Sequence, residues 1–194
     1  GLRWLSLEQR HQSRELQWSP LVLPFPISSI HIEVPGHAYM LLNTGTIGYY
    51  KYRNMGSDQE QTYFVIRPVY TMATHLVAMP DSDCVVVGCT RKFIATLGMR
   101  EHTEKLTMYS DAGPEDSIEA MQLIRPSHEV AVLFKNFHLC IMNPEASVIR
   151  RVGLVPFSQT MPVCMATHGN NIHVFPYCQQ FTYSDKTKEV KMTN

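Results

Sequence analysis

The sequence has no surplus of charge of either sign, which argues against a nucleic-acid-binding chain. Over 194 residues, 17 Lys and Arg balance 17 Asp and Glu, so the formal net charge is zero. Proteins that bind DNA or RNA gain most of their non-specific affinity by neutralising phosphates, and this favours a basic chain. We therefore do not expect nucleic acid as a partner.

Long hydrophobic runs are also missing. No apolar stretch approaches the roughly 18 residues that a membrane-spanning helix needs, and Pro24 and Pro26 interrupt an apolar stretch near the N-terminus. Residues 1–8 lack the basic segment and apolar core of a secretory signal. We expect no membrane insertion. The first residue is Gly1 rather than Met, which favours a processed chain or a fragment of a longer one.

The cysteines form no disulfide framework. There are five, an odd number, and they show no set of close pairs. No Asn-X-Ser/Thr glycosylation sequence is present. Both absences favour a reducing setting, so we expect an intracellular protein, cytoplasmic or nuclear. A buried cysteine is a common core residue, and packing within strands is the favoured role for these side chains.

What the sequence does contain is a repeat. Pro35, Pro80, Pro126 and His168 punctuate similar apolar segments and are separated by 45, 46 and 42 residues. Each repeat holds three or four short segments rich in Val, Ile, Phe, Tyr and Thr, bounded by Pro, Gly, Asn or Asp, as expected of strands and turns. The predicted first strands are 30–35, 74–80, 120–126 and 163–169. The turn at 43–46 is expected to use Gly45 for a positive φ.

Two segments remain open between alternatives. Residues 2–17 contain good helix formers without a clean apolar stripe, so they are predicted as helical or irregular. Residues 114–121 look like a capped helix start, which competes with the first strand of the third repeat. Twelve prolines spread along the chain leave little room for other long helices.

Four-stranded units that recur every 40–45 residues are typical of β-propeller blades. Over residues 27–194 the chain resembles WD-repeat and citron-homology propellers in period and strand pattern. It departs from the WD-repeat pattern because Gly36-His37 occurs once, in a different place, and Trp-Asp is absent. The resemblance implies an all-β fold of about four blades, complete or part of a larger propeller. A β-sandwich is the alternative.

The predicted organisation is an N-terminal arm, residues 1–26, followed by a repeat domain. The units are expected near 27–70, 71–113, 114–158 and 159–194. The arm is too apolar to remain free in water, so we expect it to dock on the sheets or on a partner.

No catalytic or metal-binding motif stands out. His31 and His37 are six residues apart, and His168 and His173 are five apart, which on one continuous strand places them on opposite faces. Cys84 and Cys89 lack the second pair of a zinc knuckle. No phosphate-binding loop or nucleophile elbow is present. We predict no catalytic residues, no cofactor and no metal, and hence a protein that is not an enzyme.

The sequence favours a protein-interaction scaffold, a propeller segment within a larger intracellular assembly. Its partners would be other protein chains of a complex or the remainder of the same propeller. An all-β enzyme, or a domain that binds a small ligand or metal through scattered His, Cys and Asp, is the alternative. Tyr and Arg are enriched at interface hot spots. The candidate partner-binding residues are Trp4, Trp18, Tyr50, Tyr52, Arg91 and Lys92.

Overall fold

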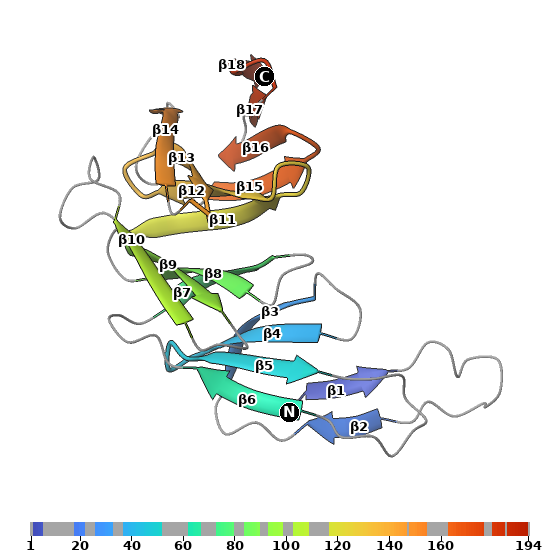
Figure 1. Ribbon diagram of the computed structural model, residues 1–194. Helices are drawn as coiled ribbons and strands as arrows, with labels where there is room; N and C mark the ends of the chain where they lie inside the picture. The colour runs from blue at the N-terminus through green and yellow to red at the C-terminus, as the bar shows by residue number, and fades with distance from the viewer. Residues whose placement is uncertain are drawn as a thin grey trace.

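The structure is a computed structural model of the chain (Figure 1). It describes residues 2–5, 18–21, 26–32, 37–51, 62–66, 73–79, 84–89, 93–98, 103–108, 117–146, 148–154, 163–176, 180–184 and 186–193. Every regular element in these ranges is a β-strand. The predicted all-β class is therefore confirmed, and residues 118–121 belong to a strand rather than to a helix.

Four antiparallel sheets of four strands each form the body of the fold. The first sheet contains β3 (Ile27–His31), β4 (His37–Leu42), β5 (Ile47–Lys51) and β6 (Thr62–Ile66). The second contains β7 (Ala73–Ala78), β8 (Cys84–Cys89), β9 (Phe93–Gly98) and β10 (Thr103–Met108). The third contains β11 (Ile118–Ile124), β12 (Glu129–Phe134), β13 (His138–Asn143) and β14 (Val148–Leu154). The fourth contains β15 (Val163–His168), β16 (Asn171–Pro176), β17 (Gln180–Ser184) and β18 (Glu189–Thr193).

Each sheet is a simple meander, with its strands paired in chain order. A fifth, two-stranded sheet, the N-terminal ribbon, pairs β1 (Leu2–Leu5) with β2 (Trp18–Leu21). The first strand of the first sheet begins at Ile27, three residues before the predicted start, and it ends at His31 rather than at Pro35. In the other sheets the first strand starts within two residues of the prediction.

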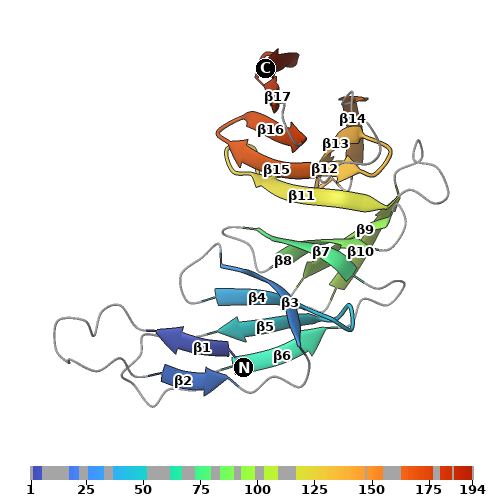
Figure 2. The ribbon, with the colours of Figure 1, turned by 180° about the vertical axis from the view of Figure 1, so that it is seen from behind.

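The four sheets follow one another in an arc. Strand β7 contacts β3 and β4 on one side and β11 on the other, and β11 in turn contacts β15. Figure 1 shows the first sheet at the lower end of this arc and the fourth at the upper end, and Figure 2 shows the same order from behind. This arrangement is that of propeller blades and not of two sheets closed face to face.

The strand sequences explain why the sheets stack. Strand β12 carries five consecutive apolar residues, and successive side chains point to opposite faces of a strand. Val130, Val132 and Phe134 enter the core shared with the second sheet, whereas Ala131 and Leu133 enter the core shared with the fourth. A strand that is apolar on both faces needs a neighbour on both sides, and the arc provides one.

Tight turns connect the strands. Gly45 in the turn between β4 and β5 has a φ of 73°, which confirms the role predicted for this glycine. Gly169, between β15 and β16, has a φ of 56°. Both lie in the left-handed region, where a residue without a Cβ atom has no steric penalty.

Candidate interaction surface

Three apolar cores hold the four sheets together. The first lies between the first and second sheets and includes Tyr39, Tyr49, Val87 and Leu97. The second lies between the second and third sheets, and the third between the third and fourth. Tyr49 packs in the first core, and its hydroxyl lies 2.6 Å from His37 Nδ1.

The first strands of neighbouring sheets contact each other, and polar side chains on two of these strands form hydrogen bonds to the next sheet. His75 Nε2 on β7 lies 3.2 Å from the backbone oxygen of Glu119 on β11. Thr167 Oγ1 on β15 donates a hydrogen bond of 2.6 Å to the backbone oxygen of Leu123, also on β11. In both pairs the residues are 44 apart, which matches the predicted repeat.

Among the titratable groups of the described residues, His75 is the one whose pKa the structure clearly shifts. Burial lowers its pKa, while the hydrogen bond to Glu119 O and the Glu119 carboxylate oppose that shift, and Lys135 adds to it. A carbonyl oxygen only accepts, so Nε2 of His75 carries a hydrogen. His75 Nδ1 lies 3.0 Å from Thr74 Oγ1, whose hydroxyl hydrogen is donated to Gly88 O at 3.1 Å. The imidazole therefore lies between the second and third sheets, where burial disfavours its charged form and lowers its pKa.

The fold is expected to lose stability on acidification through His75. Its pKa in the folded chain lies below the unfolded value of about 6.5, so the unfolded chain takes up the proton first. The free energy of unfolding should fall as the pH drops below about 6.5, by at most about 1.4 kcal/mol per pH unit for one proton. Above that pH, His75 should contribute no pH dependence.

The matched variant is His75→Gln, which does not titrate and keeps an N–H donor for Glu119 O. Urea unfolding of both proteins between pH 8 and pH 5 checks the prediction, because the other histidines are common to both. We expect the difference in unfolding free energy between wild type and variant to decrease below pH 6.5. A difference that is constant with pH would contradict it.

The first and fourth sheets, at the two ends of the arc, differ in how deeply their outward faces are buried. On the first sheet, the face turned away from the second sheet carries Ala38, Met40 and Leu42, and all three are buried. Ile30 on inner strand β3, which pairs with Met40, is 36% exposed. The part of this outward face that β4 contributes is therefore covered.

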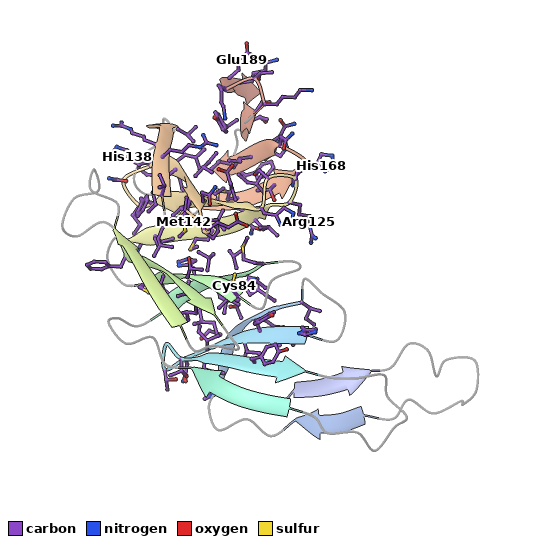
Figure 3. All side chains as sticks on the ribbon, viewed as in Figure 1. Cys84, Arg125, His138, Met142, His168 and Glu189 are labelled. Atoms are coloured by element: carbon purple, nitrogen blue, oxygen red, sulfur yellow. The ribbon has the colours of Figure 1, made fainter. Side chains whose placement is uncertain are left out.

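The outward face of the fourth sheet is uncovered. We define it as the side chains that alternate with Met165, Ile172, Val174 and Tyr183, which pack in the core with the third sheet. Its members are Cys164, Ala166, His168, Asn171, His173, Phe175, Thr182 and Ser184. None of them is buried, and Phe175 is 39% exposed. Figure 3 places His168 at the same edge of the molecule as Arg125, at the end of the neighbouring strand β11.

The polar groups at the centre of this face bind each other. His173 Nδ1 lies 3.0 Å from Thr182 Oγ1 on the paired strand β17. The rings of His173 and Phe175 stack with centroids 6.2 Å apart and an angle of 21° between their planes. Phe175 also stands opposite Cys164 in the strand register. The centre of the face is therefore an aromatic pair flanked by a thiol and a hydroxyl.

The predicted partner-binding residues are placed only in part. Trp4 and Trp18 lie on the two strands of the N-terminal ribbon, where Trp4 pairs with Ser19 and Trp18 with Leu5, so the tryptophans are not cross-strand partners. Tyr50 lies on β5, between Ala38 and Tyr63. The side chains of these three residues are outside the described part of the structure, as are Tyr52, Arg91 and Lys92 altogether. Their role in partner binding stays a prediction, and so does the docking of the arm.

The structure corrects two expectations about histidine and cysteine. His168 and His173 are not on one strand but on paired strands, and the register places both on the outward face of the fourth sheet. Cys164 is exposed there rather than packed in a core, whereas Cys89 and Cys140 are buried as expected. Cys178 lies outside the described residues. Within the described ranges, no group of three or more His, Cys, Asp or Glu is placed to hold a metal ion.

Neither the comparison with protein families nor that with curated protein sequences finds a match to this chain. Solved structures do match. Kluyveromyces lactis Hsv2 has a TM-score of 0.64 at 10% identity, over 85% of this chain and 60% of that one. The Cps50 (Swd1) β-propeller domain of Myceliophteria thermophila has a TM-score of 0.66 at 10% identity, over 89% and 60%. Dihydro-heme d1 dehydrogenase NirN has a TM-score of 0.61 at 14% identity, over 80% and 34%.

At these identities the likeness concerns the fold alone. It confirms the resemblance to β-propellers that the repeat predicted, and it supports propeller-like blades as the architecture. The chain spans 60% or less of the length of each of these structures. In the part of the chain that the structure describes, no helix has the length and apolar character to cross a membrane.

Proposed function

We propose that this chain is a non-catalytic protein-interaction module, a propeller segment that works within a larger assembly of other protein chains. The observation that carries the proposal is the unequal burial of the sheet faces. The inward faces of the four sheets pack in apolar cores, while the outward face of the fourth sheet is open. An open face at the end of an arc of blades is a surface that a partner can cover.

The length of the chain supports the same proposal. It spans 60% of the propeller structures from K. lactis and M. thermophila, so a ring of that kind needs further sheets. These sheets would come from the same polypeptide or from a second protein. The propeller scaffold presents its loops and sheet ends to partners and needs no reactive group for that task.

The alternative function is an all-β enzyme, or a domain that binds a small ligand or metal through scattered His, Cys and Asp, and His31, His37, His168 and His173 are its histidine candidates. The first two belong to the first sheet and the last two to the fourth, and Figure 1 shows these sheets at opposite ends of the arc. One ion or one small ligand cannot use both pairs. No observation therefore favours an enzyme or a metal-binding domain over the interaction module.

The proposed function is tested by isolating the tagged full chain from cells of its own species. We expect it to elute well above its own mass of 22.2 kDa together with another protein chain in fixed stoichiometry. A variant with Lys186→Ala, an exposed turn residue, serves as the matched control and should recover the same partner. Recovery of the chain alone, or only with further copies of itself, would refute the proposed function.

A further inference from the structure

We propose that the turn between β11 and β12, residues 125–128, binds an acidic segment of a partner protein. This turn lies at one end of the third sheet and is separate from the outward face of the fourth sheet. The inference rests on the proposed interaction function and deepens it, because it names a binding surface and the chemistry of the partner that fits it. Carboxylate side chains are the groups that the turn would bind.

The turn is exposed although its base is buried. Ile124 and Glu129 pair with each other at the end of the hairpin, so the four residues between them form the turn. All four are exposed, and Figure 3 shows Arg125 at the edge of the molecule. Ile124 and Val130, on either side, are fully buried. The third sheet packs against a neighbouring sheet on each face, so the exposure of its turn does not depend on the ends of the chain.

The backbone of the turn is constrained at several points. Pro126 fixes its own φ, and His128 N donates a hydrogen bond of 3.4 Å to Arg125 O, which closes the turn. Two residues before the turn, Leu123 O accepts the hydrogen bond of 2.6 Å from Thr167 Oγ1 of the fourth sheet. A surface that is already ordered loses little conformational entropy when a partner binds.

The exposed side chains of the turn are hydrogen-bond donors. The guanidinium of Arg125, the hydroxyl of Ser127 and an imidazole N–H of His128 can each donate to an oxygen atom. Glu129 is the one acidic residue in the segment 124–130, but its side chain is 16% exposed and its Oε2 lies 3.5 Å from Arg150 Nη2. The segment therefore presents positive charge, with its single carboxylate turned to Arg150. Arginine binds carboxylates through two parallel hydrogen bonds and is enriched at interface hot spots.

The backbone conformation of His128 supports a role in binding. Its φ is 54°, in the left-handed region that a residue with a Cβ atom adopts at a cost. Gly169 has a φ of 56° in the corresponding turn of the fourth sheet, where that cost is absent. Phe137 also has a positive φ, but its side chain packs against the core between the third and fourth sheets. The imidazole of His128 belongs to none of the three cores, so packing there does not offset its cost. Strained residues of this kind gather at binding sites.

A protein partner fits this turn better than a nucleic acid does. Nucleic acids are bound through many phosphate contacts at once, and the chain has no net positive charge to supply them. A single arginine with two neighbouring donors matches a small group of carboxylates instead.

The purified full chain is tested with a fluorescein-labelled peptide of alternating Glu and Gly, and with the same peptide carrying Gln in place of Glu. Fluorescence anisotropy should show saturable binding of the Glu peptide and no binding of the Gln peptide. The binding should weaken between about 50 mM and about 300 mM salt, because salt screens charge pairs. Arg125→Glu should weaken it at least about tenfold, the effect of one lost charge-assisted hydrogen bond.

Lys135→Glu is the matched control for Arg125→Glu. It makes the same reversal of charge at an exposed residue of the turn between β12 and β13, at the opposite end of the third sheet. At about 150 mM salt a charge acts over only about 8 Å, so this variant should bind the Glu peptide like the wild type. An equal loss of binding in both variants would overturn the inference.

His128→Gly separates binding from structure. We expect it to raise the midpoint of thermal unfolding, because relief of the left-handed conformation outweighs the greater freedom of glycine in the unfolded chain. It should nevertheless weaken binding of the Glu peptide. The inference would be overturned if the wild type did not bind the Glu peptide, if neither Arg125→Glu nor His128→Gly weakened the binding, or if a single-stranded oligonucleotide bound more tightly than the peptide.

The isolation from cells distinguishes this inference from the proposed function. The tagged Arg125→Glu chain should lose the partner that the wild type and Lys135→Glu recover. A partner retained by Arg125→Glu would overturn the inference and leave the proposed function intact. If the wild type recovers no partner, the proposed function fails, while the peptide titration still decides whether the turn binds carboxylates.

Discussion

Replacing Gly88 by valine is expected to lower the free energy of unfolding by about 3 kcal/mol, because the new side chain has no room between the second and third sheets. A Cβ atom at this position would lie 2.6 Å from Met121 Sδ, 2.8 Å from Ile118 Cδ1 and 3.3 Å from His75 Cβ. Both of the closest atoms are the far ends of flexible side chains, but Met121 and Ile118 are buried in the core between these sheets. Their side chains would have to leave their present positions, which disturbs the packing of that core.

The matched control is Gly153→Val on strand β14, where an added Cβ atom meets nothing within 4 Å. We expect this variant to unfold within about 0.5 kcal/mol of the wild type, as is usual for surface positions. Urea unfolding at pH 7.5, where His75 is neutral in both states, compares the three proteins. If the two valine variants had equal stability, the close approach of β11 to β8 at Gly88 would be disproved.

The sequence was sufficient to predict the sheets. Short apolar segments at a period near 44 residues, separated by residues that favour turns, indicate one four-stranded unit after another. Strand β12 is a clear case, because five apolar residues in a row fit a strand buried on both faces. The same reasoning separated strand from helix less well at residues 118–121, where the acidic start suggested a cap. Tertiary packing decides there, since Ile118 and Met121 fill the core against the second sheet.

The sequence did not predict in the same way which neighbouring sheet covers each face of a strand. Alternation shows that a strand has two faces, but when both are apolar it does not show which neighbour covers each. Cys164 illustrates the difficulty, because its residue type is usual in cores while its place on the last sheet leaves it exposed. The partner of His75 is equally hidden, since a backbone oxygen has no residue type that a sequence could reveal.

Gly88 was overlooked for a different reason. In the sequence it ends the run Val85–Gly88 and looks like a punctuating residue before a turn, but it lies within β8. A glycine inside a strand often marks a close approach of another element, and the nearest atoms here belong to β11. The strand pattern therefore contained a signal for the tightest point of the contact between the second and third sheets.

Replacing Phe134 by alanine is expected to destabilise the chain by about 3–5 kcal/mol, the usual cost of removing a buried aromatic ring. Phe134 is fully buried at the end of β12 and packs in the core between the second and third sheets. Its loss would leave a cavity that neighbours such as Ile118, opposite Phe134 on β11, and Val132, two residues away on β12, can close only in part, because both are held in paired strands. Urea or thermal unfolding measures the effect.

Phe175→Ala provides the comparison within the same residue type. Phe175 lies at the corresponding end of β16 but on the outward face of the fourth sheet, where it is 39% exposed. Its loss should cost less than about 1 kcal/mol, since much of the ring already contacts water. A cost equal to that of Phe134→Ala would mean that the outward face is covered within one copy. It would then be a fourth core of the fold, and no longer a surface available to a partner.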